Sequence, residues 1–77
     1  MNMIDYERKL LINKILDQRE KYWREFLTDP DYVVIPLHYS ELIPFDKYSS
    51  SGYYDTYYGM HVIESKNCKT IDDIMVY

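Results

Sequence analysis

The sequence predicts an α+β fold in which a long N-terminal amphipathic helix packs on a small antiparallel β-sheet. Three observations predict it: an apolar stripe with helical spacing, short β-type runs in the second half of the chain, and turn-forming residues between them. At 77 residues the chain is expected to form one small domain, residues 1–77, with a helix at 4–27 and a strand-rich region at 32–77. A domain of this size buries a small core, so its stability should be modest.

The helix at 4–27 is predicted because the segment contains no glycine or proline and repeats apolar residues every three or four positions. This spacing places the apolar residues on one wide face and charged residues on the opposite face. Asp29 and Pro30 then favour a turn, since proline cannot continue a helix. We expect seven apolar residues to form the core or a self-association surface: Ile12, Ile15, Leu16, Trp23, Phe26, Val62 and Val76.

The length of this helix raises the question of what covers its apolar stripe. A helix of this length measures roughly 36 Å, whereas a typical strand spans about 17–20 Å. A small sheet therefore leaves part of the stripe for other groups to cover. Loops of the chain are one cover, and a partner helix or a second copy of the chain is the other, because large exposed apolar patches mark interfaces.

Three later segments favour strands, at residues 32–37, 57–65 and 74–77. The first is rich in Val and Ile, and Pro36 limits it to an edge or irregular strand, because proline donates no ladder hydrogen bond. The second gives the clearest strand pattern. The third can return as a second strand.

The connections between these strands carry turn signals. Residues 38–48 indicate an irregular segment that apolar side chains hold in place. Thr70 and Asp73 fit a helix-start signature, in which a capping residue is followed three positions later by an acidic one. Few residues follow them, so any helix there should be very short.

The charge is uneven along the chain and gives a formal net charge of −4. Residues 1–28 carry six basic and five acidic residues, whereas residues 29–77 carry three basic and eight acidic residues. Nucleic-acid binding needs clustered Lys and Arg, so we expect no nucleic-acid partner. No apolar run is long enough to span a bilayer, and the N-terminus lacks the apolar centre of a signal peptide, so we expect no membrane association.

A Tyr/Ser/Gly-rich stretch, YSSSGYYDTYYG, occupies residues 48–59. Tyrosine offers a large contact area with few rotors, and Ser and Gly let the backbone adapt, as in antibody-like binding loops. The alternative is a plain loop followed by two tyrosines that open a strand, where aromatic residues are favoured. The binding interpretation assigns partner contacts to Tyr48, Tyr53, Tyr54, Asp55, Tyr57 and Tyr58.

The residue types that carry chemistry form no recognisable catalytic or metal-binding pattern. His38 and His61 are each followed by a Glu three residues later, but a strand directs such pairs to opposite faces. Cys68 is a single cysteine in a turn, where Lys66 and Lys69 could lower its pKa. We therefore expect no enzymatic activity, no metal and no cofactor.

In general character the chain resembles small phage-encoded accessory proteins, a group that includes inhibitors of bacterial defence systems. The features that carry the resemblance are a short acidic chain without alanine, the YSSSGYYDTYYG stretch and one long amphipathic helix. The resemblance implies a viral protein that acts through protein–protein interaction in the host cytoplasm. It matches no family motif and transfers no residue role.

Two functions follow from these expectations. The first is a non-enzymatic inhibitor that binds a host defence protein through the tyrosine-rich loop and an acidic surface. The second is a small virion structural or accessory protein that assembles through its amphipathic helix, as a homo-oligomer or on another phage protein. The two interpretations differ in which surface makes the contact.

Overall fold

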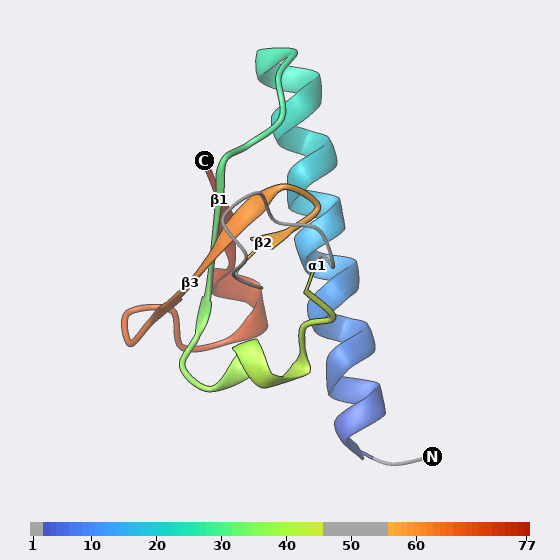
Figure 1. The fold of residues 1–77 in the computed structure, drawn as a ribbon, viewed down its shortest axis with the longest axis vertical. Helices are drawn as coiled ribbons and strands as arrows, with labels where there is room; N and C mark the ends of the chain where they lie inside the picture. Colours follow the sequence, from blue (N-terminus) through green and yellow to red (C-terminus); the bar gives the residue numbers. More distant parts are fainter. Residues whose placement is uncertain (1–2, 46–55) are drawn as a thin grey trace.

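A computed structural model describes residues 3–45 and 56–77 and places one long helix against a four-stranded sheet (Figure 1). The side chains of residues 3 and 4 lie outside this description. In chain order the elements are helix α1 (Met3–Phe26), strand β1 (Tyr32–Pro36), 3-10 helix η1 (Tyr39–Leu42), strands β2 (Thr56–Tyr57) and β3 (Met60–Ser65), 3-10 helix η2 (Ile71–Asp73) and strand β4 (Met75–Val76).

Helix α1 forms where the apolar spacing predicts it, within one residue at each end. Its outer face carries two ion pairs one turn apart, Lys21–Asp17 at 3.2 Å and Arg24–Glu20 at 2.7 Å. Such exposed pairs contribute only a few tenths of a kcal/mol each, about 0.3–0.5. The helix ends because Leu27 takes the left-handed conformation (φ 57°), and its N–H donates to the Trp23 carbonyl at 2.7 Å.

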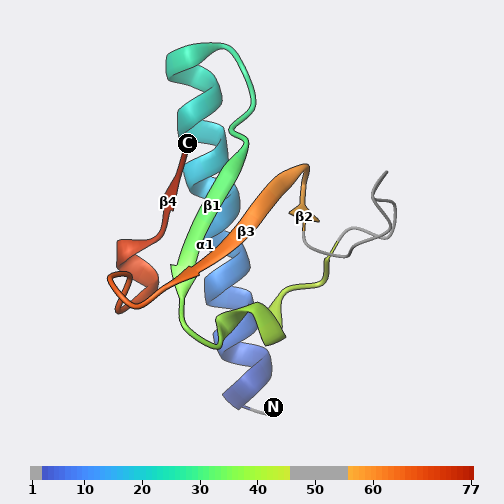
Figure 2. The same ribbon diagram turned by 60° about the vertical axis from the view of Figure 1, so that its left-hand side comes forward.

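The sheet has the strand order β2-β3-β1-β4 and is mixed, whereas the sequence analysis predicted an antiparallel sheet. Strands β1 and β3 run parallel, and the other two pairs are antiparallel. The connection between β1 and β3 is long enough to return the chain to the same end of the sheet, which parallel pairing requires. Figure 2 looks onto the sheet, with α1 behind it.

Strand β1 lies in the centre of the sheet, so its prediction as an edge strand is wrong. Pro36 is the last residue of β1 and pairs with Ser65 at the end of the ladder. The missing N–H of proline therefore falls at the end of the strand, and the residues before it keep donors for both neighbours.

The strand predicted at 57–65 is divided into β2 and β3 by a turn at Tyr58 and Gly59. Both turn residues have positive φ, 52° for Tyr58 and 79° for Gly59. Two such residues in a row suit the tight turn of a hairpin, and glycine adopts this conformation without steric cost. The C-terminal strand also forms, but it pairs with β1 and not with β3.

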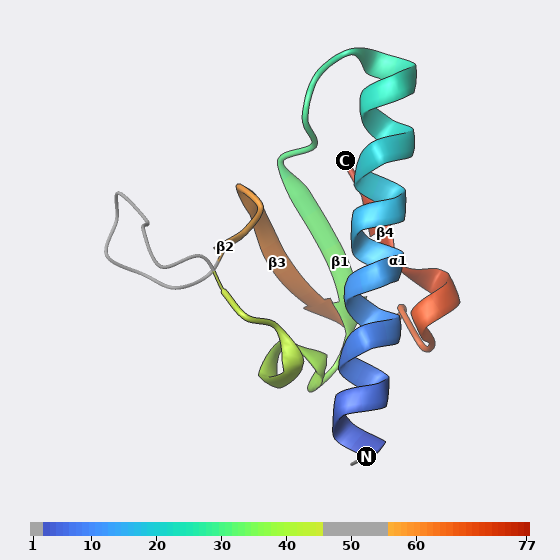
Figure 3. The same cartoon turned by 90° about the vertical axis from the view of Figure 1, so that its right-hand side faces the viewer.

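The core lies between α1 and one face of the sheet, and Figure 3 shows the molecule from the side of α1, with β4 behind the helix. Leu11 and Ile15 of α1 are fully buried against residues that alternate along the strands. The buried apolar residues are Leu11, Ile15, Val33, Ile35, Ile43, Tyr57, Met60, Cys68 and Ile74.

Of the seven residues predicted for the core or self-association, one is fully buried and four pack partly buried against the core. Ile15 is the buried one, and the partly buried residues are Ile12, Leu16, Val62 and Val76. Trp23 and Phe26 are 50% and 55% exposed, so they lie outside the core, and their role in self-association stays a prediction. The reason is length, because the last turns of α1 rise beyond the sheet (Figure 1).

Hydrogen bonds hold each of the two 3-10 helices in place. The Arg8 Nε donates to the Leu42 carbonyl at 3.1 Å, which holds η1 on the helix. At η2, the Asp73 carboxylate accepts the N–H groups of Lys69 and Thr70, both at 3.2 Å. The helix-start signature in the sequence thus forms a short 3-10 helix.

Candidate functional site

The face of the sheet opposite α1 is apolar and open to solvent among the described residues. Side chains alternate along a strand, so the residues between the core positions point to this second face. Tyr32 lies beside His61 in the β1–β3 register, and Val34 lies between Met75 and Ile63. These residues form two rows across the strands: Tyr77, Tyr32 and His61 in one, and Met75, Val34 and Ile63 in the other.

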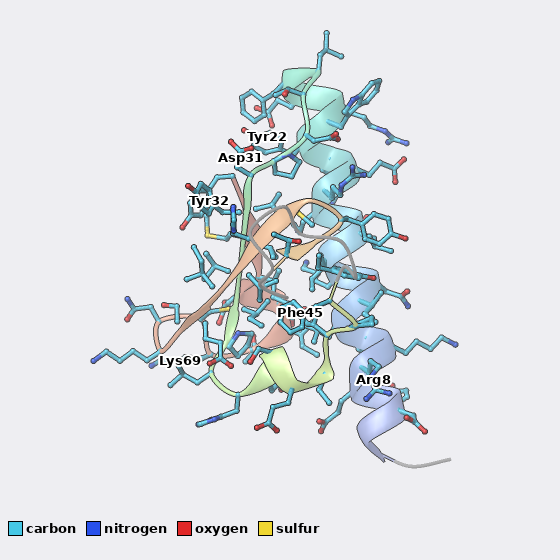
Figure 4. All side chains as sticks on the ribbon, viewed as in Figure 1. Arg8, Tyr22, Asp31, Tyr32, Phe45 and Lys69 are labelled. Atoms are coloured by element: carbon cyan, nitrogen blue, oxygen red, sulfur yellow. The ribbon has the colours of Figure 1, made fainter. Side chains whose placement is uncertain are left out.

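The first row is a series of aromatic rings in contact. The Tyr32 ring centroid lies 5.9 Å from that of Tyr77 and 5.8 Å from that of His61. The backbones of Tyr32 and Tyr77 exchange two hydrogen bonds, N–H to O, of 2.7 and 3.0 Å. The ladder therefore fixes the spacing of these rings, and Figure 4 shows Tyr32 beside Asp31 on the upper half of the sheet.

The aromatic surface continues onto the overhanging end of α1. Tyr22 and Phe26 stack one turn apart, with ring centroids 4.6 Å from each other. With Val76 and Tyr77 they line a shallow pocket of about 400 Å³. Tyr77 thus joins the helix end to the sheet face. We call this surface the aromatic band and define it by five residues: Tyr22, Phe26, Tyr32, His61 and Tyr77.

The aromatic band has the composition of a protein-binding surface. Phe26, Tyr32 and Tyr77 are 55%, 41% and 50% exposed, so each ring presents a large area to solvent. Such rings bury 150–250 Å² each on binding, by the usual order of magnitude, and tyrosine adds a polar tip. Lys21 and Glu25 both line the pocket at the helix end, and Lys21 pairs with Asp17 at 3.2 Å. Asp31 adjoins Tyr32, so Glu25 and Asp31 give the band an acidic margin.

The residues predicted for partner contact divide into three groups. Tyr48, Tyr53, Tyr54 and Asp55 lie outside the described residues. Tyr58 is 51% exposed, and its ring lies 5.5 Å from the Arg19 guanidinium in a cation–π arrangement.

Tyr57, by contrast, is only 6% exposed and belongs to the core, which corrects its assignment to a binding surface. It pairs with Met60 across the β2–β3 hairpin, and its ring is nearly perpendicular to that of Tyr58, with centroids 4.9 Å apart. The difference arises because Tyr57 is the last residue of β2 and packs into the core, whereas Tyr58 lies in the turn, with a positive φ of 52°.

Cys68 lies in a different environment from the turn that the sequence indicates. It is 6% exposed, and its Sγ lies 3.9 Å from the Val34 carbonyl oxygen and 3.7 Å from the Thr70 carbonyl oxygen. Burial raises the pKa of the thiol, and the Asp73 carboxylate raises it further. The expectation that neighbouring lysines would lower this pKa is therefore wrong.

The two histidines lie in different places. His38 has a left-handed backbone (φ 70°) before η1, and His61 stands in β3 as part of the aromatic band. Within residues 3–45 and 56–77, no group of three His, Cys, Asp or Glu side chains has the geometry to hold a metal ion.

Among the carboxylates that the structure describes, Glu64 is the one whose pKa its neighbours lower. The Ser40 hydroxyl donates to its Oε2 at 2.7 Å and holds the pKa of this exposed carboxyl below its ordinary range. The Ser40 N–H and His38 act in the same direction, while partial burial opposes them. The contact joins η1 to β3, which gives it a structural role.

Sequence reasoning did not identify Tyr22, Tyr32 or Tyr77 as binding residues. Tyr22 follows the helical apolar spacing, and Tyr32 and Tyr77 adjoin apolar strand residues, so an aromatic residue at each position is explained without a binding role. Their alignment depends on the pairing of β1 with β4, which joins distant parts of the chain. The run YVVIP is apolar or aromatic throughout, so its composition carries no signal that Tyr32 opposes the core.

Comparison with known proteins identifies no relative: no protein-family model, curated protein or solved structure matches this chain. Among the described residues, α1 and the shorter helices are too short or too polar to cross a lipid bilayer.

Proposed function

We propose that this protein is a non-enzymatic binding protein that docks another protein onto the aromatic band. The observation that supports the proposal is the continuous exposed surface of the helix end and the open sheet face, joined by Tyr77. Monomeric proteins rarely expose such a contiguous apolar patch without using it. Tyrosine is also among the residues that dominate binding energies at protein interfaces.

The margin of the aromatic band favours a partner with basic residues around an apolar pocket. The ion pairs of the described residues include neither Glu25 nor Asp31, so both carboxylates are available to a partner. The chain as a whole carries a net charge of −4, which speeds association with a basic surface. The same charges oppose stacking of nucleic-acid bases on the rings.

The biological role that we propose is inhibition of a host protein in the host cytoplasm. The resemblance to small phage-encoded accessory proteins supports this role, together with the acidic margin of the aromatic band. Binding alone suffices for such inhibition, because a small protein that covers a basic functional surface excludes its substrate. The tyrosine-rich loop remains a second predicted contact.

The exposure of Trp23 and Leu27 favours a second candidate function, assembly within a virion. These side chains are 50% and 74% exposed at the end of α1. In that case the helix end contacts a second copy of the chain or another phage protein, and the sheet face is not required.

The first experiment is an affinity pull-down of the tagged protein from bacterial lysate and from purified phage particles, followed by binding assays with each purified captured protein. We expect Tyr32→Ala and Tyr77→Ala each to weaken binding of the partner by about 30-fold or more, since truncating an anchor costs about 2 kcal/mol or more. Tyr6→Ala is the matched control, because Tyr6 is 57% exposed and lies at the other end of α1.

The proposal is wrong if the captured host protein binds the Tyr32 and Tyr77 variants as tightly as the unmodified chain. A loss of binding only in the Tyr53→Ala/Tyr54→Ala double variant would place the contact in the loop. Capture of capsid or tail proteins, lost with Trp23→Asp, would favour the virion role. Circular dichroism of each variant shows whether the helix is retained.

A further inference from the structure

A second pocket lies along the N-terminal half of α1 and is lined by residues of the helix, of η1, of η2 and of the turn before η2. Its volume is about 590 Å³, within the range of roughly 300–1,000 Å³ that small-molecule sites occupy. Leu10, Tyr39 and Ile71 supply its apolar wall, each from a different element. None of its lining residues belongs to the aromatic band.

Two lysines from distant parts of the chain face this pocket, Lys14 of α1 and Lys69 before η2. Lys14 is half-buried and Lys69 is exposed. Asp72 is the single acidic residue in the lining, which leaves the pocket with an excess of positive charge. The protein around it is acidic overall, with a net charge of −4.

Both lysines lack a carboxylate partner among the described residues, and the structure shows why. Asp17 is the helix carboxylate nearest in sequence to Lys14, and it pairs with Lys21 at 3.2 Å. Asp73 lies near Lys69 in sequence, but its carboxylate accepts backbone N–H groups at η2. The ion pairs of the described residues accordingly include neither Lys14 nor Lys69.

We propose that this pocket binds a small amphipathic anion, with its apolar body on Leu10, Tyr39 and Ile71 and its anionic group between Lys14 and Lys69. Asn13 and Thr70, which also line the pocket, provide hydrogen-bond donors for the same group. The concave shape favours a small molecule, because a few placed polar groups on an apolar wall are typical of such sites. The charge excess selects an anion.

The test uses two fluorescent probes with the same apolar body, anilinonaphthalene sulfonate, which is anionic, and N-phenyl-naphthylamine, which is neutral. We expect the anionic probe to bind with one-to-one stoichiometry and at least about tenfold more tightly than the neutral probe, which corresponds to about 1.4 kcal/mol. Amide chemical shifts in NMR spectra should change at Asn13, Thr70 and Ile71.

The next variants test the contribution of the pocket's charged side chains separately from that of its apolar wall. Lys14→Gln and Lys69→Gln should each lower the affinity for the anionic probe about fivefold and leave the affinity for the neutral probe unchanged. The control is Lys9→Gln, at an exposed position of α1, which should change neither affinity. Asp72→Asn should strengthen binding of the anionic probe at one-to-one stoichiometry and leave binding of the neutral probe unchanged, whereas misfolding exposes apolar surface and would raise binding of both probes. Displacement by decanoate assigns a carboxylate ligand, and displacement by decyl phosphate a phosphate ligand.

The proposal would be overturned by equal affinity for the two probes, by insensitivity to all three pocket variants, or by shift changes confined to Tyr32 and Tyr77. The last result would place the probe on the aromatic band. Failure of both alkyl anions to displace the probe would also overturn it. None of these outcomes depends on whether the aromatic band binds a protein.

Discussion

The burial of Cys68 shows how a single residue can differ from its sequence context. The segment NCKT contains two lysines near the thiol, which favours an exposed, activated cysteine. The folded chain instead places the Sγ against the backbone of β1, where desolvation raises its pKa. Local sequence gives the neighbours of a residue along the chain, but burial depends on segments that are distant in sequence.

We therefore expect Cys68 to be unreactive in the folded protein. Because its folded-state pKa is raised, the thiol stays protonated at neutral pH, and the thiolate fraction appears only at more alkaline pH than in the unfolded chain. Labelling with a thiol reagent at pH 7 should be at least about tenfold slower in buffer than in denaturant. Equal rates in the two conditions would show that the thiol is exposed.

At the scale of elements, α1 was predictable and the strand environments were not. The helix depends on contacts three and four residues apart, which the sequence displays directly. The position of β1 in the sheet depends on which strands flank it, and these are distant in sequence. Pro36 suggests an edge strand, but it is the last residue of β1, where the missing N–H does not prevent pairing on both sides. Trp23 and Phe26 follow the apolar stripe of α1, but the sheet ends before it reaches them.

The buried and exposed faces of α1 give a matched test of this arrangement. Leu11 is fully buried, whereas the adjacent Leu10 is 41% exposed. We expect Leu11→Ala to lower the free energy of unfolding by about 2–5 kcal/mol, because it leaves a cavity in the core. Leu10→Ala should cost about 1 kcal/mol or less.

Urea denaturation followed by circular dichroism measures both changes. A small domain of this kind has roughly 3–5 kcal/mol of stability, so the Leu11 variant should be largely unfolded without denaturant. Similar unfolding midpoints for the two variants would contradict the placement of the helix on the sheet.

At the scale of the whole molecule, the α+β class is confirmed, and the pairing of strands is what the sequence could not give. A helical stripe followed by short β runs leaves few other classes for 77 residues. The same pattern fits several strand orders. The aromatic band exists because β1 lies between β3 and β4, so the candidate site was hidden for the same reason as the strand order.

The last strand should be essential to the whole fold. Ile74 is 2% exposed, and β4 pairs with the central strand while it also packs against α1. We expect a chain that ends after Asp73 to lose cooperative thermal unfolding, because removing a buried Ile alone costs about 2–5 kcal/mol.

Calorimetry of this truncated chain checks the expectation. Met75→Ala in the full chain is the control, because Met75 is 60% exposed and its loss leaves the core intact. A truncated chain that unfolds cooperatively near the midpoint of the full chain would show that β4 is dispensable.

The central place of β1 also has a consequence for how the chain folds as it is made. Tyr32 pairs with His61 and Val33 with Val76, so both partners of the central strand leave the ribosome after it. Until Val76 has emerged, one edge of β1 has no ladder partner and depends on solvent or chaperones for cover. Helix α1 can form early from local contacts, whereas the sheet closes late. Closure of the sheet therefore follows the synthesis of β4, the last strand of the chain.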